Sequence, residues 1–360
     1  MTEAGLDALI AYSVGNQPGP TGFLSGYEPR FGFRDIAVVI VIPGAAWRLF
    51  AYAYWDRPAD QAWIEDVVVE PNLGALAAKI AAAVPASAKR VGVAGYLFFP
   101  AMLAAAIRSV RPGAELVDAS SLLTDAARIK TAAEIALLRE CAKQTDAGLR
   151  AFLAGVRLGA DERSIALGVE RAMVMAGAER LAFPVLLFSG SLVETGIGFP
   201  AAAPLTAGRQ VNIVCGALNG NYKMDLGRVT TVGAPAPAMR SVMDAAAAMH
   251  AAMLRAVRPG VTADAIARAG VDARHDRGMD EWEYSGGAPG YAGHGIGCWL
   301  DEPPTLKLGE STSIDPGMVL ILEARLARTG HGGATITDPI LVTAQGAERL
   351  SSVPIVTWAG

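Results

Sequence analysis

Three titratable residues stand in apolar or glycine-rich stretches of the chain. Asp225 lies in NYKMDLGRVTTVG, His294 between the glycines of GHGIG, and Glu323 at the end of the apolar run DPGMVLILE. A buried carboxylate is costly without a partner, so we expect the three side chains to pair with one another. Carboxylate and imidazole side chains can also bind a divalent ion such as Mn, Fe, Co or Zn. Without a metal, His294 is suited to general acid and base catalysis, with Asp225 and Glu323 orienting it.

The segment that contains these residues has predictable secondary structure. Thr131 and Glu134 form a T-x-x-E capping box, which predicts a helix from Ala132 to about Val156. Apolar spacing predicts further helices over 160–177, 238–257 and 263–277. Short apolar runs bounded by Gly and Pro predict strands at VLLF, VNIVCG, KMDLGRVTTVG, MVLILEARL and PILVT.

The first third of the chain has a different pattern. The runs DIAVVIVIP and RVGVAG are typical of buried strands, and NLGALAAKIAAAV and PAMLAAAIRSV repeat apolar residues at helical spacing. This alternation predicts an α/β domain with helices flanking a mixed sheet. We therefore expect two domains, residues 1–127 and 128–360.

Composition narrows the class of protein. The chain has 360 residues, of which 52% are hydrophobic and 18% charged, with a net charge of −4, so it can bury a large core and has no global attraction to nucleic acid or anionic lipid. Three cysteines without paired spacing favour a reducing compartment. The N-terminal residues lack the basic start of a secretory signal, and no apolar run approaches the ~20 residues that cross a bilayer. We expect a cytoplasmic protein with no nucleic-acid or membrane partner.

Four ordered segments resemble the creatinase/aminopeptidase P (pita-bread) superfamily. GHGIG, DEPP and DPGMVLILE resemble its G-H-G-I-G…H-E-x-P…P-G-M-V-x-x-x-E segment, and NYKMDLGRVTTVG its G-Y-x-S-D-x-T-R strand. GGATITDPILVT is similar to G-x-R-I-E-D-x-x-x-V-T, and TGFLSGY to a turn of the N-terminal domain. The resemblance implies a creatinase-type α/β N-terminal domain and an α+β pita-bread catalytic domain.

The resemblance also implies a reduced metal site. Peptidases of this superfamily hold two divalent ions with two Asp, one His and two Glu. Asp225, His294 and Glu323 match three of these ligands, but the first Asp is replaced by Val214 and the last Glu by Thr337. The expected cofactor is therefore none or a single divalent ion, with no two-metal centre.

Other family positions suggest substrate contacts. Asp301 replaces the second His of the H-G-x-G-x-x-x-H pattern, Arg228 matches the Arg after the second Asp, and Thr337 is expected to line the pocket. His331, in TGHGG, is a candidate to replace a lost catalytic His. The His that contacts substrate in the peptidases falls at Ile197, and the Arg of R-I-E-D is Thr335. These losses argue against ordinary Xaa-Pro peptidase chemistry.

One N-terminal feature resembles the creatinase subgroup. There an aromatic residue and an Arg reach across a dimer and grip a substrate carboxylate; here PRFGFRD supplies Arg34 with Phe31 or Phe33 beside it. The leading hypothesis is a homodimeric, creatinase-like hydrolase of a C–N bond in a small carboxylate-bearing amide, amidine or ureide, with His294 moving protons. The alternatives are a mononuclear metal-dependent Xaa-Pro-type peptidase, a lyase of the same superfamily, and a catalytically silent peptide- or protein-binding domain.

Overall fold

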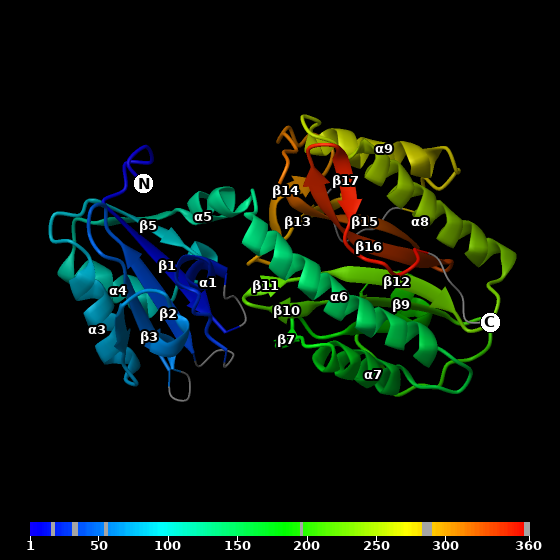
Figure 1. The fold of residues 1–360 in the computed structure, drawn as a ribbon, viewed down its shortest axis with the longest axis horizontal. Coiled ribbons are helices and arrows are strands. Elements are labelled where there is room, and N and C mark those ends of the chain that lie inside the picture. Colours follow the sequence, from blue (N-terminus) through cyan, green and yellow to red (C-terminus); the bar gives the residue numbers. More distant parts are fainter. Residues whose placement is uncertain (16–18, 31–34, 54–56, 195–196, 283–289, 356–360) are drawn as a thin grey trace. The chain divides into compact units, whose positions relative to one another are not determined.

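The chain folds into two compact units, Met1–Ala127 and Arg128–Gly360. The computed structural model describes residues 1–15, 19–30, 35–53, 57–194, 197–282 and 290–355, and each unit is considered by itself (Figure 1). Within these residues no helix is both long and apolar enough to cross a membrane.

The N-terminal unit is built on a mixed six-stranded sheet. Its strand order is β4-β3-β2-β1-β5-β6, with β1 antiparallel to β2 and parallel to β5. Side chains of α3 and α4 pack with those of the sheet in one apolar cluster, as helical spacing predicts. The strands are β1 (Ala8–Val14), β2 (Ile36–Val41), β3 (Arg48–Tyr52), β4 (Asp66–Val69), β5 (Arg90–Ala94) and β6 (Glu115–Asp118); the helices are α1 (Gly19–Ser25), α2 (Pro58–Gln61), α3 (Leu73–Ala83), α4 (Ala101–Val110) and α5 (Ser120–Ala127).

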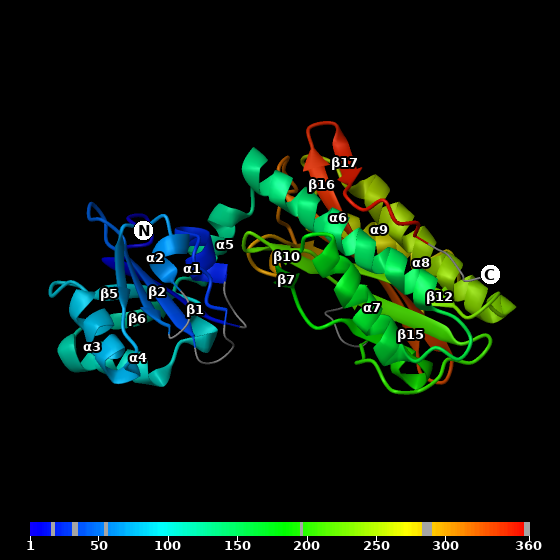
Figure 2. The same ribbon diagram turned by 60° about the horizontal axis from the view of Figure 1, so that its bottom comes forward.

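The C-terminal unit contains an eight-stranded sheet in the order β14-β13-β15-β16-β12-β9-β8, with β17 paired to β16, and a small sheet β11-β10-β7. The pairs β13–β15, β16–β12 and β12–β9 join strands that are not consecutive in the chain, which brings the three candidate segments into one sheet (Figures 1 and 2). The strands are β7 (Arg180–Leu181), β8 (Leu186–Ser189), β9 (Gln210–Cys215), β10 (Ala217–Asn219), β11 (Tyr222–Lys223), β12 (Leu226–Thr231), β13 (Gly293–Gly295), β14 (Glu302–Leu306), β15 (Val319–Arg328), β16 (Gly332–Thr343) and β17 (Gly346–Arg349).

Two helix pairs cover this sheet: α6 (Ala132–Gly155) with α7 (Glu162–Met175), and α8 (Pro237–Ala256) with α9 (Ala263–His275). The capping box at the start of α6 is confirmed, because the Thr131 and Glu134 side chains each accept a hydrogen bond from the other's backbone N–H. One apolar cluster joins α6 and α7 to β9, and a second joins α8 and α9 to β15 and β16. The predicted fold class, an α/β domain followed by an α+β domain, is confirmed.

Candidate functional site

Strand alternation decides which side chains face away from the covering helices. On β15, Leu322 and Ala324 pack into the cluster under α8 and α9, so Glu323 between them projects from the opposite face. On β9, Ile213 and Cys215 pack under α6 and α7, so Val214 projects from the face that the helices leave free.

Four residues form a row across this free face. Val214 on β9 is the Cα partner of Gly227 on β12, Gly227 of Thr337 on β16, and Thr337 of Glu323 on β15. Gly227 makes room for its neighbour, because a Cβ added there would lie 2.9 Å from the Thr337 hydroxyl. Of the two positions at which family ligands are replaced, Thr337 thus lies beside Glu323 and Val214 lies at the other end of the row.

Close backbone packing places His294. It sits on β13 between β14 and β15, and Gly293 has a φ of +132°, which favours glycine. A Cβ added at Gly293 would lie 1.8 Å from the Ile321 carbonyl oxygen, and one at Gly295 would lie 2.6 Å from that of Pro303. The glycines on either side of the histidine are therefore required by the approach of the neighbouring strands.

The three candidate residues converge. Their ligand atoms all lie within 4.8 Å of one another, and all three residues are buried. His294 Nε2 is 3.2 Å from Glu323 Oε1 and 3.9 Å from Asp225 Oδ2. Asp301, whose side chain is largely exposed, adds a carboxylate oxygen 3.1 Å from the same nitrogen. The imidazole is therefore faced by three carboxylates.

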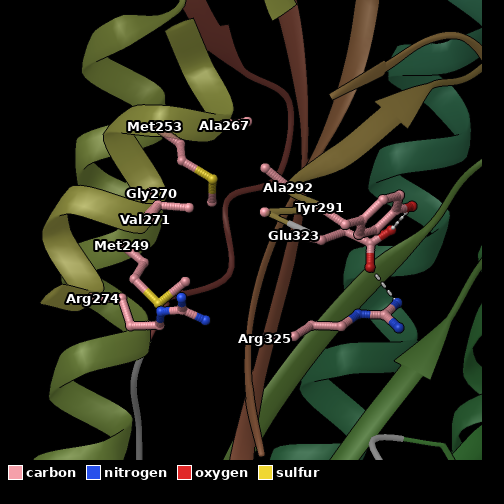
Figure 3. A pocket seen from close by; sticks show the side chains of 11 residues that line it. Met249, Met253, Ala267, Gly270, Val271, Arg274, Tyr291, Ala292, Glu323 and Arg325 are labelled. Carbon is pink, nitrogen blue, oxygen red and sulfur yellow. Dashed lines mark hydrogen bonds and ion pairs between the residues drawn. The ribbon is translucent and has the colours of Figure 1, made fainter. Parts of the chain in front are cut away.

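Two further side chains contact Glu323. The Tyr291 hydroxyl donates to Oε1 over 3.0 Å, and the Arg325 guanidinium pairs with Oε2. Figure 3 shows Tyr291, Glu323 and Arg325 together, with Met249 and Arg274 across a small cavity of about 30 Å³. Each oxygen of Glu323 thus has its own partners, and the carboxylate is held on both sides.

Burial and charge shift the acidities of the site. Although burial alone lowers it, the hydrogen bond and charge of Glu323 raise the pKa of His294 to about 9. Burial and then the charge of Glu323 raise the pKa of Asp225 above the usual range of an aspartate. Burial would raise the pKa of Glu323 as well, but the charges of Arg325 and His294 and the hydrogen bonds from His294 and Tyr291 lower it. In the metal-free cluster, therefore, a proton on His294 balances part of the carboxylate charge.

The cluster forms one wall of a cavity of about 600 Å³. Its lining contains both polar and apolar side chains. The polar lining residues are Asp225, Tyr291, His294, Asp301, Thr305, Lys307, Glu323 and Arg325, and the apolar ones are Phe183, Pro184, Leu186, Ile197, Phe199, Val214 and Leu300. A volume of this size suits a small-molecule or dipeptide substrate.

Three of the predicted substrate contacts do not line this cavity. Arg228 is 1% exposed, and its guanidinium binds Asp338 over 2.6 Å and the backbone carbonyl of Pro354. Arg228 shares its face of β12 with Leu226, which packs under α6 and α7, so Arg228 is directed away from this cavity and not toward the predicted substrate contact. His331 is exposed on the turn before β16 and lies against Trp282, also away from the cavity. Thr337 belongs to the row on the free face of the sheet but does not line the cavity. Its hydroxyl is buried without a hydrogen-bond partner among the described residues.

Among the predicted substrate-binding residues that the structure describes, Asp301 alone both lines the cavity and contacts His294. The predicted anchors Arg34, Phe31 and Phe33 lie outside the described residues. Sequence reasoning missed Arg325, Tyr291 and Lys307. The signal for Arg325 was available, because a residue two positions after Glu323 on a strand projects from the same face.

The residues present fit one divalent ion. His294 Nδ1 lies 2.8 Å from the Gly295 carbonyl, which can only accept, so Nδ1 donates there and Nε2 is directed at the carboxylates. Asp225 Oδ1 is buried with no hydrogen-bond partner in the described part of the chain, as an unused ligand atom would be. The residues do not fit a second ion, since Val214 and Thr337 place no carboxylate in the row.

Comparison with known proteins agrees with this architecture. The pattern of metallopeptidase family M24 matches residues 136–344, more than half of the chain. A Pyrococcus furiosus Xaa-Pro dipeptidase is 29% identical over 66% of this chain and 67% of its own length, and the Bacillus subtilis peptidase YqhT is 28% identical over 69% of each. The chain thus spans about two thirds of the length of these relatives.

Solved structures extend the likeness to the whole fold. The Xaa-Pro dipeptidase from Bacillus anthracis superposes with a TM-score of 0.85 at 22% identity, covering 99% of this chain and 96% of the other. An Escherichia coli aminopeptidase P variant in complex with substrate superposes with a TM-score of 0.76 at 16% identity, over 97% and 92%. At these identities the structural comparison establishes the fold, and the matched family establishes a hydrolase of this superfamily.

Proposed function

Since the chain belongs to metallopeptidase family M24, we propose that it hydrolyses the amide bond of a small Xaa-Pro-type dipeptide, using one divalent ion held by Asp225, His294 and Glu323. The relatives reported above are named dipeptidases and peptidases, which favours this alternative over the creatinase-like hypothesis.

The observation that carries the proposal is the convergence of three buried ligand atoms within 4.8 Å at the wall of a substrate-sized cavity. Two carboxylates and a neutral imidazole balance the charge of one divalent ion and suit Mn, Fe, Co or Zn. When bound, such an ion would polarise a substrate carbonyl and lower the pKa of a bound water. The loss of carboxylates at Val214 and Thr337 supports one ion in place of two.

The chain's own residues would prepare the site for this chemistry. The Gly295 carbonyl sets the tautomer of His294, and Tyr291 orients Glu323 through Oε1. Asp301 reaches His294 Nε2 from the solvent side and is placed to accept a proton at the cavity mouth. Burial of the cluster strengthens each of these interactions by excluding water.

The cavity itself suits a short peptide with an apolar residue. Phe183, Pro184 and Leu186 offer an apolar wall for a proline ring or aliphatic side chain. Lys307 is half-buried in the lining of the same cavity and offers a positive charge to a substrate carboxylate. An Xaa-Pro dipeptide with a free C-terminus carries both an apolar ring and a carboxylate.

Measuring the metal content of the protein and its cleavage of dipeptides in parallel tests the proposed function. Elemental mass spectrometry of the purified protein is expected to find about one equivalent of metal, absent from Asp225→Ala and present in Asp280→Ala, a surface control. Xaa-Pro dipeptides supplied with Mn²⁺ or Co²⁺ are expected to be cleaved by the parent and the control alone. Cleavage that survives complete metal removal would overturn the proposal.

A second candidate is the creatinase-like, metal-free hydrolysis of a C–N bond in a small carboxylate-bearing amide, amidine or ureide. The contact of His294 Nε2 with three carboxylates favours it, because that arrangement holds a proton beside the cavity without any ion. Turnover of ureides or N-substituted amino acids by metal-stripped protein, lost in His294→Ala, would select this candidate. Turnover of neither class would favour a lyase or a silent binding domain.

The quaternary structure and location expected from the sequence belong to the same proposal. We propose a cytoplasmic homodimer in which Arg34 of one protomer reaches the substrate of the other. Light scattering tests the dimer, and mixing Arg34→Ala with Asp225→Ala protomers tests the shared site. Partial recovery of activity on mixing supports sharing, and no recovery in a proven mixed dimer rejects it.

A further inference from the structure

We propose that Arg325 is a tethered cation that takes over the charge-balancing role of a second metal ion, so that the site accepts one ion only. This inference rests on the proposed function, because it concerns the ion held by Asp225, His294 and Glu323. It assigns a role to a residue that the sequence patterns above do not single out.

The first observation is the way in which Glu323 is shared. Oε1 faces His294 Nε2 at 3.2 Å, where an ion would bind, and Oε2 pairs with the Arg325 guanidinium (Figure 3). The Glu323 side chain is 2% exposed and that of Arg325 is 14% exposed, so the pair is shielded from water. A carboxylate with a positive group on each oxygen has the same electrostatic arrangement as one that bridges two cations.

The second observation is the place of Arg325 on the sheet. It stands two residues after Glu323 on β15, so both side chains project from the face that carries the Val214–Thr337 row. Its Cα partner on β16 is Thr335, which is buried and uncharged. Arg325 also lines the large cavity, so its charge lies at the site and not on the outer surface.

The charges then account for a single ion. Asp225 and Glu323 carry two negative charges, which one divalent ion neutralises. Arg325 adds one positive charge that is fixed, because a guanidinium does not lose its proton in proteins. Arg325 and the carboxylate of Asp301 offset each other, so a second divalent ion would enter a site whose negative charge is already balanced, with no carboxylate at Val214 or Thr337 to favour it.

Calorimetric titration of Mn²⁺ into metal-stripped protein tests this role. Arg325→Gln is expected to bind Mn²⁺ about tenfold or more tightly than the parent, because a like charge beside the ion is gone. Arg325→Lys keeps the charge and is expected to bind as the parent does. Arg328→Gln is the matched control, since Arg328 lies on the same strand but pairs with Glu281 at the surface. Equal or weaker binding by Arg325→Gln overturns the inference.

Thermal unfolding in EDTA separates this inference from the proposed function. With no metal present, Arg325→Gln leaves Glu323 without its cation and is expected to lower Tm by several degrees, while Arg325→Lys stays close to the parent. Added Mn²⁺ is expected to raise Tm more in Arg325→Gln than in the parent. If no variant binds Mn²⁺, the single-ion function fails and the inference fails with it, whereas Mn²⁺ binding by the parent without tighter binding by Arg325→Gln leaves the function standing and rejects the inference alone. An equal loss of Tm in both variants rejects it.

Discussion

Thr337 on β16 lies directly opposite Glu323 on β15, and both side chains project from the same face of the sheet. The Thr337 hydroxyl is fully buried, has no hydrogen-bond partner among the described residues, and occupies the position at which the family resemblance places a carboxylate. Position 337 therefore has the orientation of a ligand that the sequence no longer supplies.

This relationship predicts a gain of metal binding. Thr337→Glu places a carboxylate beside Glu323 and is expected to tighten Mn²⁺ binding by about tenfold, since added charge and a further ligand both favour the ion. Calorimetry of metal-stripped protein measures the change.

Gln345→Glu, on the exposed turn between β16 and β17, adds the same charge elsewhere and is expected to have no effect. Unchanged affinity in Thr337→Glu, with the fold intact by circular dichroism, would mean that this row does not face the ion.

The second prediction concerns His294. His294→Gln keeps a polar side chain of similar size but loses the imidazole, and is expected to reduce kcat by about 10²-fold or more. Steady-state kinetics on an Xaa-Pro dipeptide measures it. His275→Gln, at an exposed position paired with Asp280, is expected to retain full activity. An active His294→Gln enzyme would exclude His294 from the reaction.

The third prediction concerns the buried ion pair of Lys130 and Glu302, whose side chains are 2% and 0% exposed. Glu302 also accepts a hydrogen bond from the Trp299 N–H, so it supports the turn that follows His294. Lys130→Met leaves a buried charge unpaired and is expected to lower the free energy of unfolding by about 3–5 kcal/mol in urea titrations.

Two comparisons sharpen this experiment. Lys143→Met breaks an exposed pair on α6 and is expected to change stability by less than about 1 kcal/mol. The double variant Lys130→Met with Glu302→Leu removes both charges and should recover much of the loss. If the double variant is as unstable as Lys130→Met alone, packing and not charge determines the effect.

The sequence predicts those features of the structure that depend on residues close together in the chain. A capping box predicts the start of α6, and an apolar run predicts the strand that carries Glu323. Both signals consist of residues that are neighbours in the sequence. The surroundings of Arg228 are not local: its partners Asp338 and Pro354 come from β16 and the C-terminal segment that folds back over it. The match of Arg228 to a family position suggested a substrate contact, whereas long-range packing places its guanidinium in the interior.

The fourth prediction concerns His250 and pH. It is buried on α8, with Nε2 3.4 Å from Asp338 Oδ2 and with Arg228 and Arg349 nearby. Burial lowers the pKa of His250 to about 4; the charge of Asp338 opposes this shift, and the two arginines add to it. Between pH 6.5 and 4 the unfolded chain binds a proton that the folded chain does not, so this contribution to stability is complete above pH 6.5 and is lost as pH falls to 4.

Urea unfolding of the parent and of His250→Gln at pH 7 and pH 4 measures this effect. The parent is expected to lose on the order of 3 kcal/mol more than the variant over that range. His275→Gln serves as the control and should lose as much as the parent. Identical pH dependence in the parent and His250→Gln would mean that His250 takes up a proton in the folded state.

The glycines that flank His294 have a consequence for how the site is assembled. The backbone carbonyls of Ile321 and Pro303 leave space only for hydrogen at these two positions, so the peptide packing of three strands locates the imidazole. That packing is made by backbone atoms and involves no metal-binding side chain. An arriving ion would find its ligands preorganised, and the same scaffold can exchange ligands such as those at positions 214 and 337 while the histidine keeps its place.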